Sequence, residues 1–264
     1  MPGPFFMPSP DFRVHIRQKV CDFLRNLGRD WQLCTLGPYR GGMTLSIPDL
    51  LGPDAPGVRM IEVTTLSGSA SVKGTSQALG NATDAALFAA MRDWADAIVV
   101  GTTTAQAEDY GGSATPLYVL SYSFSLDPHS RLFTEGTPIL AVPHAQLADA
   151  ALSARRAAYE AAGARFLDTG DGSMASVVAA LRAQGHERIV CEGGPGIYSG
   201  FIAEDLVDAL YLTVHPLLSS SVDTPLVFPK PAAKAGFHRD MRLDNVAADT
   251  DGTVFLRYTR ARSR

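Results

Sequence analysis

The chain has 264 residues, of which 46% are hydrophobic and only 19% are charged. This composition supplies enough apolar side chains for a sizeable core, which excludes a disordered, collagen-like or coiled-coil chain. The formal net charge of −4 offers no overall positive charge for nucleic acid, so we expect no nucleic-acid partner.

Cysteine usage and hydropathy exclude three further classes. The cysteines, Cys21, Cys34 and Cys191, form no CxxC motif and no cluster with histidine, which argues against a disulfide scaffold and against a metal site. The absence of a run of 18 apolar residues argues against a membrane span. The N-terminus has no basic segment and is interrupted by prolines, unlike a signal peptide. We therefore expect a soluble, cytoplasmic protein.

The first 55 residues differ from the rest of the chain. Apolar side chains at 11–27 lie near helical spacing, and Gly28 stands where it can end that helix. The residues from 37 to 57 are dense in glycine and proline, which is typical of a loop or linker. We expect 1–55 to be an N-terminal extension, made of a helix and a Pro/Gly-rich linker, and 56–264 to form the main domain.

From Met60 onward, short apolar strands alternate with helical stretches. Runs of isoleucine and valine between helices are typical of strands covered on both faces, which indicates a largely parallel sheet. We expect the last strand to be antiparallel and to lie at an edge. The predicted fold is an α/β domain with a mostly parallel central sheet and helices on both faces. Strands are expected at 60–66, 96–101, 116–122, 138–142, 164–170, 188–194, 208–216 and 253–260, and helices at 85–94, 146–162 and 173–185.

Three of these strands end in residues suited to ligand binding. In an open α/β sheet, ligands bind beyond the carboxyl ends of the strands. One strand runs into Glu192 and the glycine-rich turn Gly194–Gly200, which opens a helix. Backbone N–H groups at such a turn suit a pyrophosphate, although glycine turns also follow strands for purely structural reasons.

The other features of these strand ends are polar side chains. Glu192 follows a buried strand directly, so its carboxylate either accepts ligand N–H groups or braces the turn. A second strand ends in Thr102–Thr104, followed by Glu108, and a third ends in Thr64–Gly68, followed by Ser76. Three such ends meeting at one crevice predict a nucleotide site.

These segments resemble a known family. TTLSGSASVKGTSQAL, LFAAMRDWADAIVVGTTTAQAEDYGG and RIVCEGGPGIYSGFIAEDLVDALYLTVHP are similar to the C-terminal reductase domain of bacterial riboflavin-biosynthesis deaminase-reductases (RibD). Stand-alone actinobacterial pyrimidine reductase-like proteins are the most similar branch, and the resemblance runs from about Val58 to Tyr258. It implies a dihydrofolate reductase-like fold, NADPH as cofactor and a homodimer. The zinc motifs of the deaminase domain are absent from the sequence, so we expect no deamination.

The resemblance also implies roles for individual residues. Substrate contacts fall on Ser76, Arg92 and Glu192, where Arg92 meets a phosphate and Glu192 receives the N–H groups of a pyrimidine ring. A surface helix arginine is the alternative for Arg92. The implied catalytic residues are Glu192 and Ser67. NADPH contacts fall on Val63, Thr104, Glu108, Ser123, Gly194, Pro195, Gly196, Ile197, Tyr198, Ser199 and Gly200.

The chain departs from the family pattern at three places. Ser67 stands where relatives usually have an aspartate, so proton delivery is expected from water ordered by Ser67. Tyr122 and Ser125 stand in a loop where relatives often have arginine, which leaves the preference between NADPH and NADH open. Ala78 occupies a position that is aromatic in some riboflavin reductases.

The sequence supports three hypotheses for function. The first is an NADPH-dependent reductase of 5-amino-6-(5-phosphoribosylamino)uracil or a related pyrimidine. The second is a reductase of a dihydrofolate-like pterin, against which Ser67 argues because pterin reduction favours a carboxylate facing the ring nitrogens. The third is a nucleotide-binding protein without reductase activity.

Overall fold

The structure is a computed structural model that describes residues 45–228 and 239–261. The helix predicted at 11–27 lies outside the described residues. A compact unit begins at Leu45, before the boundary that the sequence predicted at residue 56. Within the described residues, no helix is long and apolar enough to cross a membrane.

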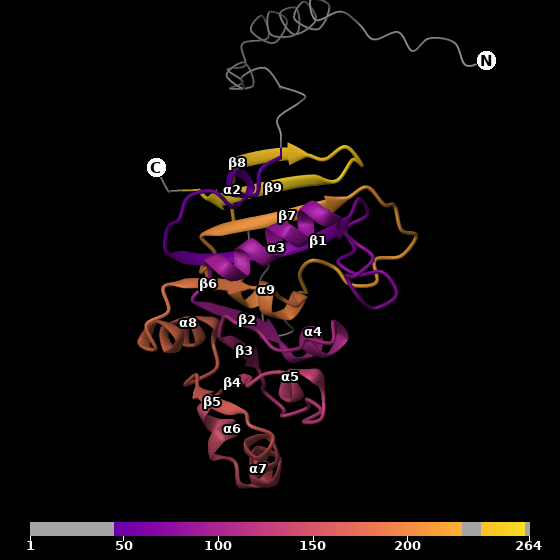
Figure 1. The fold of residues 1–264 in the computed structure, drawn as a ribbon. Helices are drawn as coiled ribbons and strands as arrows, with labels where there is room; N and C mark the ends of the chain where they lie inside the picture. Colours follow the sequence, from indigo (N-terminus) through magenta and orange to yellow (C-terminus); the bar gives the residue numbers. More distant parts are fainter. Residues whose placement is uncertain (1–44, 229–238, 262–264) are drawn as a thin grey trace, which may run out of the picture. The chain divides into compact units, whose positions relative to one another are not determined.

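A single mixed sheet organises the described part of the chain (Figure 1). Its strand order is β5-β4-β3-β2-β6-β1-β7-β9-β8, and every neighbouring pair from β5 to β7 is parallel. The predicted mostly parallel sheet is therefore confirmed. The strands are β1 (Gly57–Thr65), β2 (Ala97–Gly101), β3 (Leu117–Leu120), β4 (Ile139–Val142), β5 (Arg165–Asp168), β6 (Arg188–Cys191), β7 (Ala209–His215), β8 (Met241–Ala248) and β9 (Val254–Arg260).

The antiparallel part of the sheet differs from the prediction in one respect. The strand predicted at 253–260 is antiparallel, as expected, but it lies between β7 and β8 and not at the edge. The edge strand is β8, which the sequence did not reveal. Its sequence, MRLDNVAA, places polar and apolar residues on both faces, and no position in it is buried. Without a buried face the hydrophobic alternation that marks a strand is missing.

Helices cover both faces of the sheet, which confirms the predicted layers. Alternate strand residues enter two separate hydrophobic clusters, because successive side chains of a strand point to opposite faces. Ile98 and Val100 pack with α3, α5 and α7, whereas Ala97 and Val99 pack with α8 and α9. These helices are α3 (Ala82–Trp94), α5 (Arg131–Thr134), α7 (Ser153–Ala161), α8 (Met174–Ala183) and α9 (Pro195–Ala203).

The single helix predicted at 146–162 is wrong. The structure has α6 (His144–Ala148), a 3-10 turn (Ala150–Leu152) and then α7. Asp149 breaks the helix because its backbone is extended, with φ −69° and ψ 116°, and its carboxylate accepts the N–H of Ala151. An aspartate that bonds to a nearby backbone N–H favours a turn over a helix interior. Alanine-rich composition concealed this break.

The segment before β1 is part of the domain. The short helix α2 (Ile47–Leu51) buries Leu50 in the core, and the side chain of Arg257 donates to the carbonyl of Leu50 at 2.7 Å. The sequence assigned these residues to a linker because of their glycines and prolines.

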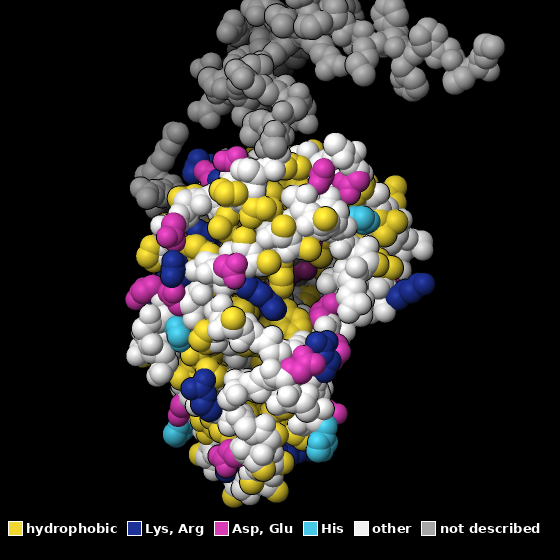
Figure 2. All heavy atoms as spheres, in the orientation of Figure 1, with side chains coloured by type: hydrophobic (Ala, Val, Ile, Leu, Met, Phe, Trp, Pro, Cys, Tyr) yellow, Lys and Arg dark blue, Asp and Glu magenta, His cyan; other side chains and the backbone are white. Residues whose placement is uncertain are grey.

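Figure 2 shows the face of the domain on which charged side chains of both signs are interspersed.

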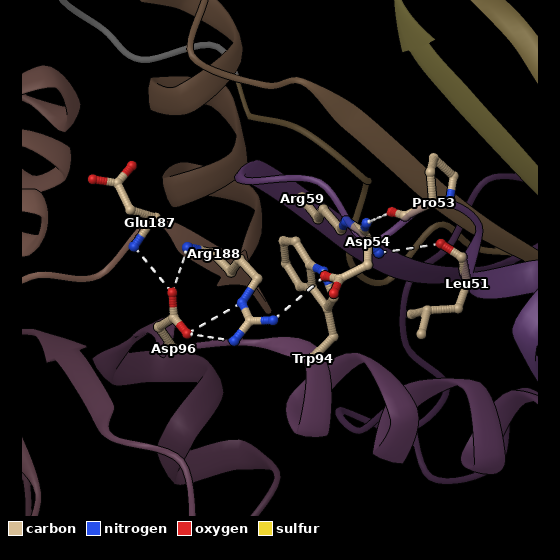
Figure 3. Close-up of polar contacts among 8 residues, drawn as sticks. All are labelled: Leu51, Pro53, Asp54, Arg59, Trp94, Asp96, Glu187 and Arg188. Carbon is tan, nitrogen blue, oxygen red and sulfur yellow. Dashed lines mark hydrogen bonds and ion pairs between the residues drawn. The ribbon is translucent and has the colours of Figure 1, made fainter.

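One arginine ties this segment to the amino end of the sheet (Figure 3). Arg59, on β1, is 5% exposed and donates to the carbonyls of Leu51 and Pro53 at 3.1 and 2.6 Å. Its guanidinium lies over the ring of Trp94 at 3.6 Å, so a cation–π contact joins β1 to α3. These hydrogen bonds satisfy backbone carbonyls in a stretch that the sequence analysis assigned to a linker.

The same cluster connects two neighbouring strands (Figure 3). The indole of Trp94 donates to Asp54 at 3.0 Å, and Arg188, at the start of β6, lies 3.4 Å from Asp54 and 2.9 Å from Asp96. All of these contacts lie at the amino end of the strands. The carboxyl ends, where ligands bind in such sheets, are left free for a site.

Candidate active site

A cavity of about 950 Å³ opens at the carboxyl ends of β1, β2, β3 and β6. Figure 2 shows a hollow in this face with an acidic side chain in its depth. Most residues that the sequence assigned to cofactor or substrate line this one cavity, so the structure brings the three predicted strand ends together. They are Val63, Ser76, Thr104, Glu108, Ser123, Glu192, Gly194, Pro195, Gly196, Ile197 and Tyr198.

Four of the predicted residues do not line the cavity. The hydroxyl of Ser67 lies 3.0 Å from that of Thr65 and 2.7 Å from that of Ser219, so it connects two loops. Ser199 donates to a backbone carbonyl of its own helix, and Gly200 is buried inside α9. Arg92, the fourth, approaches the site only through another residue.

The two positions that follow Glu192 after β6 must be glycine, because a side chain there would collide with neighbouring residues. Gly193 has φ +89°, and a Cβ atom there would lie 2.8 Å from the ring of Tyr198. At Gly194 a Cβ atom would lie 2.5 Å from the hydroxyl oxygen of Thr104. The hydroxyl of Tyr198 in turn donates to the carbonyl of Ile61 on β1. The turn is therefore packed against both neighbouring strands.

The helix that follows this turn presents its first backbone groups to the cavity. Gly194 is the N-cap of α9 and provides no side-chain capping bond. Pro195 has no N–H, and the N–H groups of Ile197 and Tyr198 donate to the carbonyl of Gly194, so the N–H of Gly196 is left for a ligand. A Cβ atom at Gly196 would meet no other atom within 4 Å. This open backbone is the part of the site best suited to a negatively charged group.

The opposite wall is built by α4 (Thr102–Ala107) and the loop before α3. Glu108, which ends α4, accepts the N–H of Ser76 at 2.6 Å, so two residues predicted to contact different ligands bind each other. At the rim, Tyr122 donates to the carbonyl of Gly172 at 2.8 Å. These contacts fix the entrance without using a positively charged side chain.

Glu192 is bound by two side chains of the protein. Its side chain is 1% exposed, and it accepts Nε and Nη2 of Arg92 at 2.7 Å each and the hydroxyl of Tyr110 at 2.8 Å. The guanidinium of Arg92 also lies over Phe88, at 4.6 Å. Burial, followed by the charge of Glu192, raises the pKa of Tyr110 well above its usual range, so Tyr110 stays a neutral donor.

Two further carboxyl groups line the cavity that the sequence analysis did not single out. Asp84, in the first turn of α3, reads in the sequence as an ordinary helix-start acid. Burial raises the pKa of its carboxyl, while a hydrogen bond from Thr213 and the charge of His215 act in the opposite direction. Glu62 lies on β1, between Ile61 and Val63. An acidic residue between apolar neighbours of a strand was the available signal.

All charged side chains that line the cavity, among the described residues, are acidic. Glu62, Asp84, Glu108 and Glu192 line it, and no lysine, arginine or histidine does so among the described residues. The described residues also bring together no group of three histidine, cysteine or acidic side chains that could hold a metal ion. The wall thus offers carboxyl groups, hydroxyls and backbone N–H groups as its polar chemistry.

The chain belongs to the RibD C-terminal domain family, which it matches over residues 56–255. The fold and the position of the cavity agree with this assignment, and the resemblance inferred from the three segments is confirmed. No curated protein sequence matches the chain significantly.

Solved structures give the same fold. A pyrimidine reductase-like protein from Corynebacterium diphtheriae is 29% identical, with a TM-score of 0.70, over 79% of this chain and 93% of that one. RibD from Acinetobacter baumannii is 16% identical, with a TM-score of 0.60, over 79% of this chain and 59% of that one. The riboflavin biosynthesis reductase Rib7 from Saccharomyces cerevisiae is 15% identical, with a TM-score of 0.55, over 92% and 99%. The dihydrofolate reductase-like fold is thereby confirmed.

The Arg92–Glu192 pair leads to a stability prediction. Arg92→Met leaves a buried carboxylate without its cation, so we expect it to lower the free energy of unfolding by about 3 kcal/mol. The double variant Arg92→Met/Glu192→Gln should lose less than the sum of the single variants, by about 1–3 kcal/mol, because contacting residues are coupled. Urea unfolding of the four proteins measures this difference.

The exposed pair Arg131–Glu135, at 53% and 47% exposure, is the matched control for this cycle. The corresponding variants there should show coupling of only about 0.5 kcal/mol, because water screens an exposed pair. Strictly additive effects at Arg92 and Glu192 would contradict the structural role of their ion pair.

Proposed function

We propose that this chain is an oxidoreductase that uses NADPH to reduce 5-amino-6-(5-phosphoribosylamino)uracil or a related pyrimidine. Membership of the RibD C-terminal domain family supports a reductase of this pathway, as does the likeness to the pyrimidine reductase-like protein and to Rib7. The observation that carries the proposal is one cavity that unites the open N-terminus of α9 with Glu108, Ser76 and Glu192.

The residues of the cavity fit a dinucleotide. Within Gly194–Tyr198, the N–H of Gly196 would bind the pyrophosphate, since a helix N-terminus and a glycine turn together favour an anion. Thr104 and Ser123 would contact the ribose groups, and Val63 would lie against the nicotinamide. When bound, the dinucleotide supplies hydride to the substrate, and the protein supplies position and electrostatics.

A nearby cation supports NADPH over NADH. Arg155, on α7, donates to the carbonyl of Ser123 at 3.0 Å, which brings a positive charge to a residue assigned to the cofactor. Arginine is suited to a phosphate because its guanidinium offers several donors in one plane. The serines of the 122–125 loop add hydroxyl donors.

The protein's own groups would orient the pyrimidine. Arg92 and Tyr110 fix the carboxylate of Glu192. Its Oε2 accepts two of these bonds and its Oε1 one, so Oε1 keeps acceptor capacity for a ring N–H group. Tyr110, which lines the cavity, remains a neutral hydroxyl beside it. A positioned carboxylate of this kind lowers the entropy that is lost when substrate and cofactor are aligned.

The dinucleotide site is tested at Gly196. Gly196→Val adds a side chain in open space beside the first turn of α9, so the free energy of unfolding should change by less than about 0.5 kcal/mol. The affinity for NADPH should fall at least about tenfold, or 1.4 kcal/mol, because the added group obstructs the space in front of the backbone N–H of residue 196. Fluorescence titration with NADPH and with NADH measures both affinities.

Ala203→Val, at an exposed position of the same helix, is the control and should bind as the wild type does. Wild-type protein that binds neither nucleotide would remove the proposed function. Equal binding of both would remove the preference for NADPH and the role given to Arg155.

A specific observation favours a pterin as a second candidate substrate. Asp84 places a carboxyl group in the cavity. Burial raises its pKa, and a hydrogen bond from Thr213 opposes that rise. A carboxylate facing the nitrogens of a pterin ring is the feature that Ser67 left missing. The acidic lining also suits a ring rich in N–H groups better than a substrate that carries a phosphate.

Asp84→Asn distinguishes the two substrates. If a dihydrofolate-like pterin is the substrate, the variant should lower kcat/KM for it at least about tenfold, 1.4 kcal/mol of transition-state stabilisation. Turnover is measured as NADPH oxidation with dihydrofolate and, separately, with the pyrimidine. Asp93→Asn, exposed on the same helix, is the control. Binding of NADPH without turnover of either substrate would favour a nucleotide-binding protein without reductase activity.

We also propose a homodimer that forms through the edge of the sheet. Strand β8 leaves one edge unpaired within the described residues, and Leu243 and Val246 on it are 44% and 49% exposed. An open edge with exposed apolar side chains favours pairing with another chain.

The dimer is tested by sedimentation. Leu243→Lys/Val246→Lys should convert the dimer to a monomer, because lysine on an edge opposes strand pairing. Leu218→Lys, which changes a leucine at 75% exposure away from β8, should leave the dimer intact. A wild type that sediments as a monomer at all accessible concentrations would exclude this assembly.

A further inference from the structure

Glu62 occupies an unusual place on β1. Its strand neighbour Met60 packs in the cluster under α8 and α9, and Glu62 is the next residue on that face. Met60 pairs with Cys191, the last residue of β6, so β6 has ended by the level of Glu62. The side chain of Glu62 therefore faces the cavity beside the glycine turn and not a neighbouring strand.

No cation compensates this carboxyl group. The titratable groups that face it among the described residues are Cys191 from β6, Tyr198 from α9 and Glu108 from α4. Its partner on β7 is Leu212, which does not titrate. None of these groups is positive, and the described residues give Glu62 no ion pair.

This environment favours the neutral form of Glu62. Burial raises the pKa of its carboxyl well above the usual range. The N–H of Val63 opposes this rise, and the charge of Glu108 makes the smallest contribution, which adds to it. Burial also raises the pKa values of Cys191 and Tyr198, so both stay neutral.

Asp84 provides the contrast. It receives a hydrogen bond from Thr213, whereas the nearest groups to Glu62 donate nothing to it beyond one backbone N–H. Burial raises the pKa of both carboxyl groups, but Thr213 and the charge of His215 oppose the rise at Asp84, so Glu62 is the better suited of the two to hold a proton. Glu62 has the surroundings of an acid.

We propose that Glu62 is the proton donor of the reduction, a catalytic role that rests on the proposed function. As hydride from the nicotinamide forms the new C–H bond, the π electrons of the C=N or C=O double bond move to its nitrogen or oxygen, which takes the carboxyl proton of Glu62. The dinucleotide is oxidised, the substrate is reduced, and Glu62 remains as a carboxylate that water reprotonates. Ser67, outside the cavity, has no part in this transfer.

The protonated state is tested without turnover. An acid whose pKa is raised on folding binds more protons folded than unfolded, so it lowers the stability of the protein as pH rises from the ordinary carboxyl range to the folded pKa. Glu62→Gln keeps the shape of the neutral acid and cannot ionise. The urea midpoint of the wild type should decrease over this pH range, and the midpoint of the variant should decrease less. The infrared band of a protonated carboxyl, present in the wild type, should be absent from the variant. Identical pH dependences would overturn the proposal.

The catalytic role is tested by the pH profile of kcat/KM. The wild type should lose activity as pH rises through the pKa of Glu62, which gives the pH profile a descending limb. Glu62→Gln should be slower by about a hundredfold, and its profile should lack that limb. NADPH affinity should be retained. Glu62→Asp should restore a limb, and Glu108→Gln should move it to lower pH, because a repelling charge is removed. An unchanged limb in Glu62→Gln would overturn the role.

Failure of this proposal differs from failure of the proposed function. Should the wild type bind NADPH but reduce no substrate, the reductase function fails while the folding and infrared measurements still report the state of Glu62. Should the wild type turn over and Glu62→Gln match it at every pH, only the role of Glu62 fails.

Discussion

The site depends on where β6 ends. This strand is held between β2 and β1, and it stops at Cys191 while β1 continues to Thr65. The chain can turn there only because Gly193 and Gly194 have no Cβ atom to collide with Tyr198 and Thr104. The early end of one central strand leaves room for the cavity, directs the first turn of α9 into it and uncovers the side chain of Glu62 on the neighbouring strand.

Much of the fold could be predicted because buried parallel strands are rich in isoleucine and valine. The runs that form β2, β4 and β6 needed no further context. The glycine and threonines after β2 and the glycines after β6 predicted the cavity. Features that depend on a partner far along the chain could not be predicted. Strand β8 has no buried face, and α2 packs through carbonyls that bind Arg59 and Arg257, which are not its sequence neighbours.

The candidate site shows the same division. The sequence marked residues by their type and position after a strand, and this brought Ser76, Glu108 and Glu192 to the right place. It could not show that Arg92 is used by Glu192, because that bond joins residues that lie far apart along the chain. Nor could it separate Asp84 from other acids that begin helices.

The distribution of charge connects the fold with the proposed chemistry. Glu192 is fixed by a cation, Asp84 by a hydroxyl donor, and Glu62 by neither. Burial raises the pKa of both Asp84 and Glu62, but the pKa of Glu62 lies well above its usual range, whereas a hydroxyl donor and the charge of His215 oppose the rise at Asp84. Three acidic side chains around one cavity are therefore not interchangeable. In the proposed roles, Glu192 orients the N–H groups of the ring and Glu62 holds the proton that is transferred, so both functions lie within the same walls.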